Sequence, residues 1–172
     1  MIKIFINTII ILTIGLISHA QNAEYIPSIR PGNNVNLNLF GDASIISINY
    51  ERLFLNTGTF FLTGKLGIGY SESMKLPNGN TSLLSTPMHI SANVNVSKGI
   101  HFIEFGLGNT LLFYANFKYW DYSLYPLIGY RLQPLRPGRI TVRIFISYPL
   151  TGKIDFNDYW FSPVGLNVGY TF

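Results

Sequence analysis

Residues 89 to 91 are His-Ile-Ser. Of all the short motifs in this sequence, this one most resembles part of a catalytic site. A histidine within hydrogen-bond reach of a serine can act as a general base and activate the hydroxyl as a nucleophile. Side chains alternate along a β-strand, so His89 and Ser91 would share one face, with Glu104 as an acid on a following strand. The competing interpretation, which we favour, is that both are polar side chains that fill the interior of the fold.

Five charged residues lie on the polar side of segments in which apolar and polar residues alternate: Glu51, Lys65, Glu104, Arg131 and Arg143. Counted from the neighbouring turns, all five fall towards the same end of the fold. Two acids and three bases at similar heights predict one buried interior charge network. The network is interpreted as an internal plug rather than a gate or a proton path, because buried charge must be paired.

The turns between these segments predict the register of the network. A three-residue turn at 56–58 would place Leu55 opposite Thr59 and Lys65 diagonal to Glu51. A two-residue turn at 98–99 would place Glu104 opposite Asn93. The Pro-rich stretch at 134–138 would put Arg131 and Arg143 on neighbouring strands.

Other candidates for chemistry are weaker. Asp155 and Asp158 share a loop with Asn157, but two carboxylates without fixed spacing make a poor cation site. The Gly-x-Gly at 106–110 lies within a strand-like segment with no helix after it, so it is not a phosphate loop. The chain has no cysteine, which excludes thiolate catalysis and Cys-based metal sites. We therefore predict no catalytic residue, no metal and no cofactor.

The elements that must position these residues are extended. Apolar and polar residues alternate strictly in eight segments, which is typical of strands with a different environment on each face. No segment has helical periodicity. The eight segments cover residues 34–40, 44–54, 61–70, 89–96, 103–111, 127–133, 140–148 and 164–172. Short Gly-containing turns alternate with longer connections, which is the arrangement of an up-and-down barrel of the outer-membrane kind.

The composition is unusual for a soluble domain. The chain is 48% hydrophobic and only 12% charged, against about a quarter charged in typical soluble domains. Residues 1–20 read as a secretory signal peptide, with Lys3, an apolar stretch and a small-x-small site at Ala20. Residues 21–172 then form one domain without a run long enough for a membrane helix. Basic residues are scattered, which excludes a nucleic-acid footprint.

The composition of the polar face indicates whether the apolar face contacts lipid or a protein core. It consists mainly of Gly, Ser, Asn and Thr, which fit the crowded interior of an eight-stranded barrel. In hydrocarbon a closed barrel is the β-structure that leaves no backbone group unpaired. Aromatic residues gather at two heights, as membrane interfaces select: Tyr50, Phe54, Tyr130, Tyr170 and Phe172 near the short turns, and Tyr70, Trp120, Tyr148 and Trp160 near the longer loops. Arg52 is the one charge on the apolar face and lies close to a turn.

The closing stretch, Val-Gly-Leu-Asn-Val-Gly-Tyr-Thr-Phe, resembles the final strand of small outer-membrane barrels, with Tyr170 and Phe172 in the terminal positions. In those proteins the ending is read by the barrel assembly machinery. With the motifs at 48–54, 103–108 and 128–131, the chain resembles a family of small, mostly uncharacterised Gram-negative outer-membrane barrel proteins. The resemblance implies a location and a fold far more than an activity.

The His-x-Ser pattern also resembles that of lipid A deacylase barrels, in which Ser, His and Glu form a triad. The chain departs from that family because Ala92 stands where the family has Asn, and Glu104 falls about four residues out of register with His89. The family's triad faces lipid, whereas His89 and Ser91 fall on the polar face.

Three functions follow from the sequence. The first is a non-enzymatic integral outer-membrane barrel with a structural, adhesion or surface-interaction role through its extracellular loops. Its partners would be outer-membrane lipid, lipopolysaccharide and an unknown extracellular partner. The second is a lipid A-modifying hydrolase that uses His89 and Ser91, and the third is a soluble periplasmic barrel that binds an apolar ligand.

Overall fold

The computed structural model describes residues 30–73, 81–97, 99–114, 120–150 and 161–172. The predicted signal peptide, Asp155, Asp158 and Trp160 lie outside the described residues. The described part contains eight strands and no helix. The strands are β1 (Asn33–Leu39), β2 (Ile46–Asn56), β3 (Phe60–Ser73), β4 (Thr81–Ser97), β5 (His101–Tyr114), β6 (Trp120–Leu132), β7 (Ile140–Ser147) and β8 (Val164–Thr171).

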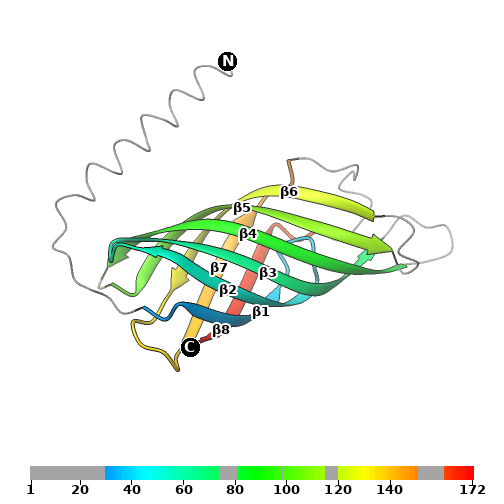
Figure 1. Ribbon diagram of the computed structural model, residues 1–172. Coiled ribbons are helices and arrows are strands. Elements are labelled where there is room, and N and C mark those ends of the chain that lie inside the picture. Colours follow the sequence, from blue (N-terminus) through cyan, green and yellow to red (C-terminus); the bar gives the residue numbers. More distant parts are fainter. Residues whose placement is uncertain (1–29, 74–80, 98, 115–119, 151–160) are drawn as a thin grey trace, which may run out of the picture.

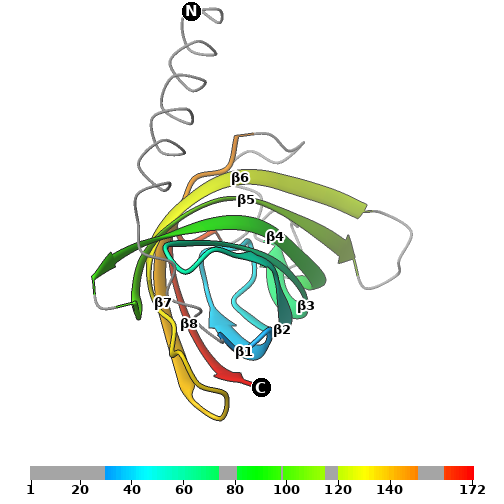
Figure 2. The same cartoon turned by 60° about the vertical axis from the view of Figure 1, so that its left-hand side comes forward.

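The eight strands form one closed antiparallel barrel in which each strand pairs with its neighbours in sequence. β1 closes the sheet by pairing with β8, and Leu37 lies opposite Val168 in that ladder. Figures 1 and 2 show the strands winding around a common axis, with β1 and β8 side by side. The predicted eight-stranded barrel is confirmed.

The barrel has two different ends. Its turn end carries the connections at 57–59, 98–100 and 133–139, together with the start of β1 and the end of β8. Its loop end carries the connection at 40–45, the ends of β3, β5 and β7, and the starts of β4, β6 and β8. In Figure 1 the turn end lies on the left and the loop end on the right.

Side-chain alternation separates an apolar outside from a polar inside. Along β7 and β8 exposed and buried residues alternate without a break. The buried residues include a continuous set of Asn, Ser and Thr side chains, whereas large aliphatic residues are exposed on the outer wall. Predicted aromatic residues follow the same division: Tyr50, Phe54, Tyr130, Tyr170 and Phe172 are exposed towards the turn end, and Tyr70, Trp120 and Tyr148 towards the loop end.

Two strands extend well beyond their predicted bounds. β4 begins at Thr81 rather than at 89, and β6 begins at Trp120 rather than at 127. The added segments break the expected alternation, because the apolar side chains of Leu83 and Tyr125 face inward and are buried. Leu83 packs there with other buried apolar residues, so apolar residues near the loop end do not mark the outer face.

The predicted pairing is correct for Glu104 and wrong for Glu51 and Lys65. Glu104 lies opposite Asn93, as expected. The connection before β5 has three residues rather than the predicted two, and a β-bulge between Asn95 and Ser97 compensates for the extra residue. Arg131 and Arg143 lie on neighbouring strands, as expected, and the structure places them directly opposite each other.

Glu51, however, lies directly opposite Lys65 instead of diagonal to it, and Leu55 pairs with Leu62 rather than Thr59. The connection itself is longer than the predicted three-residue turn, because Asn56 pairs with Phe61, and a β-bulge between Leu53 and Leu55 then shifts the register by one residue.

Candidate functional site

The candidate site is the filled interior of the barrel, where side chains from opposite walls meet. Nη2 of Arg131 on β6 pairs with Oε1 of Glu51 on β2. Arg143 on β7 reaches the second oxygen of Glu51 at 3.6 Å, and its Nε lies 2.9 Å from Oε2 of Glu104 on β5. Four of the five predicted charges thus form one chain of ion pairs across the barrel. An eight-stranded barrel is narrow enough for such contacts.

The fifth charge, Lys65, has a different partner from those predicted. Its Nζ lies 3.5 Å from Oδ2 of Asp42, and both side chains are buried. Asp42 belongs to the connection between β1 and β2, which lies between the two predicted strand segments 34–40 and 44–54. The signal available in the sequence was a lone acid among the small residues of Gly-Asp-Ala-Ser at 41–44.

The connection at residues 40–45, here called the inward loop, folds into the barrel mouth. Asp42 is 0% exposed, and the neighbouring Ala43 and Ser44 are buried as well. Phe40 and Ala43 both adopt positive φ, a conformation that non-glycine residues rarely take and that turns the chain back on itself here. Gly41 has a φ of 80°, and a Cβ there would lie 2.6 Å from the backbone of Gly165.

Side chains of the barrel wall form hydrogen bonds with two backbone carbonyls of the inward loop and with one of its serine hydroxyls. Thr110 on β5 donates to the carbonyl of Asp42, and Ser147 on β7 donates to the carbonyl of Gly41. The hydroxyls of Ser44 and Ser85 are 2.8 Å apart. Burial raises the pKa of Asp42, although the charge of Lys65 acts against this rise. The inward loop therefore closes the loop end of the interior.

A directed chain of hydrogen bonds connects the ion pairs to the inward loop. Arg143 can only donate, so Nδ1 of His89, 3.1 Å away, must accept, and the ring proton sits on Nε2. Nε2 then donates to the hydroxyl of Tyr125 over 2.8 Å. That hydroxyl lies 2.9 Å from the hydroxyl of Thr110, which in turn bonds Asp42. The geometry fixes one tautomer of His89 and one direction for the chain.

The arrangement around His89 and Ser91 differs from a catalytic triad. Both side chains are buried inside the barrel, and the hydroxyl of Ser91 bonds Thr63 at 2.9 Å. His89 lies opposite Gly108, four positions from Glu104, and Glu104 pairs with Arg143 instead. Within the described residues, no hydrogen bond joins His89 to Ser91 or to Glu104. Both nitrogens of His89 already have partners inside the barrel.

Arg30 fills the interior at the turn end, and this role was not predicted from the sequence. Its guanidinium carbon lies 4.4 Å from the ring centre of Phe102 and 5.3 Å from that of Phe61. Its Nη2 donates to the carbonyl of Gly58 over 3.1 Å. Burial, with the nearby charge of Arg131, lowers the pKa of Arg30 to about 10, so it remains protonated at neutral pH. Arg30 precedes β1, outside the predicted alternation.

Little free space remains between these two closures. A void beside Glu51, Arg131 and Gln133 has a volume of about 10 Å³, which is room for about one water molecule. Across the described residues, no three His, Asp or Glu side chains are grouped so that they could hold a metal ion. The interior can therefore hold fixed charge and exclude solvent.

Comparison with protein-family models, with curated proteins and with solved structures finds no match to the chain. The resemblance to small outer-membrane barrel proteins therefore rests on the short motifs of the sequence alone. In the part of the chain that the structure describes, no helix is long and apolar enough to cross a membrane.

Proposed function

We propose that the protein is an integral outer-membrane barrel whose role is non-enzymatic. The observation that carries the proposal is the inverted distribution of side chains. Ile48, Ile68 and Ile90 are each about two thirds exposed on the outer wall, at 65%, 65% and 69%. Glu51, Lys65, Glu104, Arg131 and Arg143 are all buried inside. An apolar surface of this extent requires a partner, and lipid is one that can surround the whole barrel.

The ends of the apolar wall support the same proposal. Exposed tyrosine, tryptophan and phenylalanine side chains occur towards both ends, as at membrane–water interfaces. Arg52 is exposed near the turn end of β2, opposite Asn33. At that height its long side chain can reach an interface, where a charge costs roughly 0–1 kcal/mol.

The filled interior supports a scaffold rather than a general pore. The inward loop closes one end, Arg30 closes the other, and the ion pairs occupy the space between them. Surface contacts would then be made at the loop end, through the connections between β3 and β4, between β5 and β6, and between β7 and β8. We propose that these loops carry a structural, adhesion or surface-interaction role towards lipopolysaccharide or an extracellular partner.

The same interior weighs against a soluble barrel that stores an apolar ligand. Such barrels need an apolar cavity in which to hold the ligand. Here the central side chains are asparagines, serines and paired charges, such as Asn36, Asn49 and Glu104.

Location and heat modifiability test the proposal. The full chain, expressed with its own N-terminal segment, should fractionate with outer membranes. It should also migrate differently on gels before and after boiling, because a closed barrel resists detergent until heated. Recovery as a folded protein in the soluble periplasmic fraction, without detergent, would contradict the proposal and favour the soluble barrel.

A further inference from the structure

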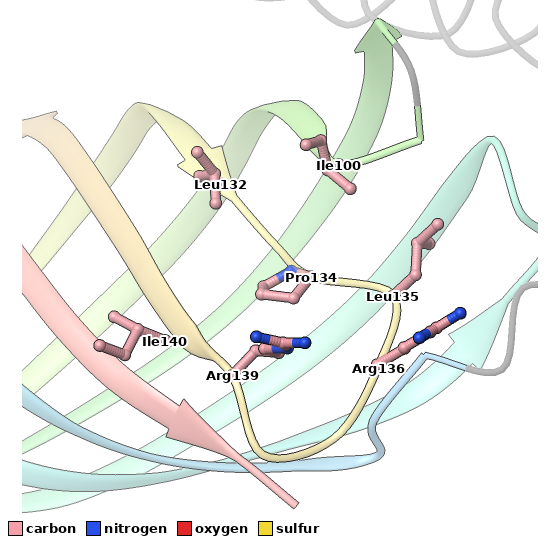
Figure 3. A pocket seen from close by; sticks show the side chains of 7 residues that line it. All are labelled: Ile100, Leu132, Pro134, Leu135, Arg136, Arg139 and Ile140. Atoms are coloured by element: carbon pink, nitrogen blue, oxygen red, sulfur yellow. The ribbon is translucent and has the colours of Figure 1, made fainter.

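An open hollow lies at the turn end of the barrel, beside the connection between β6 and β7 (Figure 3). Its volume is about 420 Å³. Apolar side chains including Leu132, Leu135 and Ile140 line it, together with Arg136 and Arg139. The hollow thus combines an apolar lining with two cationic groups.

The two arginine side chains are free to bind a ligand. Both are exposed, and within the described residues neither has an acidic group in ion-pair distance. Their backbone, in contrast, is fixed to the end of β8. Thr171 donates its amide to the carbonyl of Arg139 over 3.0 Å, and Gly138 donates to Thr171 over 2.7 Å. The turn therefore presents two free guanidinium groups on an anchored backbone.

The hollow adjoins the apolar outer wall. Ile140 begins β7 and is 63% exposed, and Val142 continues the same outward row on this strand. Tyr170 lies opposite Ile140 on β8 and is also exposed. A ligand with an anionic head at Arg136 and Arg139 would find continuous apolar surface for a chain directed along the wall.

We propose that this hollow binds an anionic glycerophospholipid. The phosphate would lie between Arg136 and Arg139, because guanidinium groups pair with phosphate through two parallel hydrogen bonds. An acyl chain would run past Ile140 along β7. The inference rests on the proposed membrane location, and it adds a headgroup preference at one place on the barrel.

Charge complementarity is what selects this ligand. A zwitterionic lipid carries its own cation beside the phosphate, so it gains less from two arginines than an anionic lipid does. Basic side chains at a membrane surface each strengthen the binding of anionic lipid by about fivefold. Replacing both should therefore reduce the retention of anionic lipid by at least about tenfold.

Native mass spectrometry of the folded, full-length barrel in neutral detergent provides the test. Phosphatidylglycerol and phosphatidylcholine with identical acyl chains are titrated separately, and the bound lipids are counted. We expect the wild type to retain phosphatidylglycerol preferentially, and Arg136→Gln with Arg139→Gln to lose this preference. Arg52→Gln, an exposed arginine on a different part of the same end, is the matched control and should retain it.

The possible outcomes separate the two proposals. Equal retention of phosphatidylglycerol by the wild type and the double variant would overturn the lipid site alone. Full competition by inorganic phosphate would also overturn it, because the hollow would then be a simple anion site. Heat modifiability and insertion into phosphatidylcholine vesicles are measured on the same samples. A wild-type protein that fails to enter vesicles would overturn both the membrane location and the lipid site.

Discussion

Arg143 and Glu104 form an ion pair inside the barrel, with 2.9 Å between Nε and Oε2 and both side chains buried. The same guanidinium also faces Glu51 at 3.6 Å. One residue of β7 therefore links carboxylates on β2 and β5, two strands that are not neighbours in the barrel. The charges connect opposite walls and do not merely neutralise one another along a strand.

Removing the charge of Glu104 should destabilise the barrel. Glu104→Gln keeps the size of the side chain but leaves Arg143 with the more distant Glu51 as its one remaining carboxylate partner. Breaking a buried pair from one side costs about 3–5 kcal/mol, and the remaining partner should bring the loss towards the lower end. Reversible urea unfolding in detergent or lipid measures this loss.

The matched control for that measurement is Glu72→Gln. Glu72 is partly exposed near the loop end, where its carboxylate accepts a hydrogen bond from Tyr70. Exposed interactions of this kind contribute roughly 0–1 kcal/mol. If both variants unfold at the same urea concentration, the ion pair does not stabilise the barrel.

Gly108→Ala should disturb the hydrogen-bond chain through steric contact. A Cβ at Gly108 would lie 2.2 Å from the ring of Tyr125. The ring cannot move away freely, because its hydroxyl bonds both His89 and Thr110. Overpacking of this kind costs about 1–3 kcal/mol. Gly32→Ala is the control, since a Cβ there would meet nothing within 4 Å. Equal unfolding free energies for the two variants would show that the ring adjusts without cost.

A cysteine pair can report whether the inward loop stays inside the barrel. The chain contains no cysteine, so introduced thiols have no native competitor. Because the hydroxyls of Ser44 and Ser85 are 2.8 Å apart, Ser44→Cys with Ser85→Cys should oxidise to a disulfide. Intact-mass analysis without reductant detects it. Ser44→Cys with Ser91→Cys should stay reduced, since Ser91 bonds Thr63 instead. Free thiols in both variants would mean that the loop leaves the mouth.

The raised pKa of Asp42 predicts a pH-dependent difference between the wild type and Asp42→Asn. Burial raises this pKa in the folded state, so the folded protein binds more protons there than the unfolded chain does. The contribution of Asp42 to stability must then fall as the pH rises from about 4 through the folded-state pKa. The difference in unfolding free energy, wild type minus Asp42→Asn, should therefore decrease as the pH rises from about 4 towards neutrality. Urea unfolding midpoints measured across this range test the sign, and a difference that increases with pH would contradict it.

The barrel could be predicted from the sequence because a barrel places one simple physical requirement on the order of residues. A wall with an apolar outside and a polar inside needs alternation of period two, and segments such as 34–40 and 164–172 follow it strictly. Gly-containing turns then set the order of the strands. The predictions of strand extent were wrong where inward apolar residues interrupt the alternation, as Leu83 and Tyr125 do.

The candidate site could be predicted only in part, for a related reason. Alternation alone places Glu51, Glu104 and Arg143 on the inner face, so their inward direction follows from the sequence. The pairing of the individual charges depends on bulges and loop conformations, which have no periodic pattern in the sequence. The bulge near Leu53 changes the register by an amount that no pattern reveals, and the inward loop brings in Asp42 through two residues with positive φ.

The pairing of β1 with β8 also has a consequence for how the chain folds. Each hairpin joins strands that follow one another, whereas this seam joins residues about 130 positions apart, such as Leu37 and Val168. Until β8 has been made, β1 and β7 each present a free edge, and free edges invite pairing with other chains. In lipid every unpaired backbone group on those edges costs several kcal/mol. In the proposed membrane location the complete barrel would therefore be favoured over any shorter version, and the free edge of β1 would be costly until β8 pairs with it.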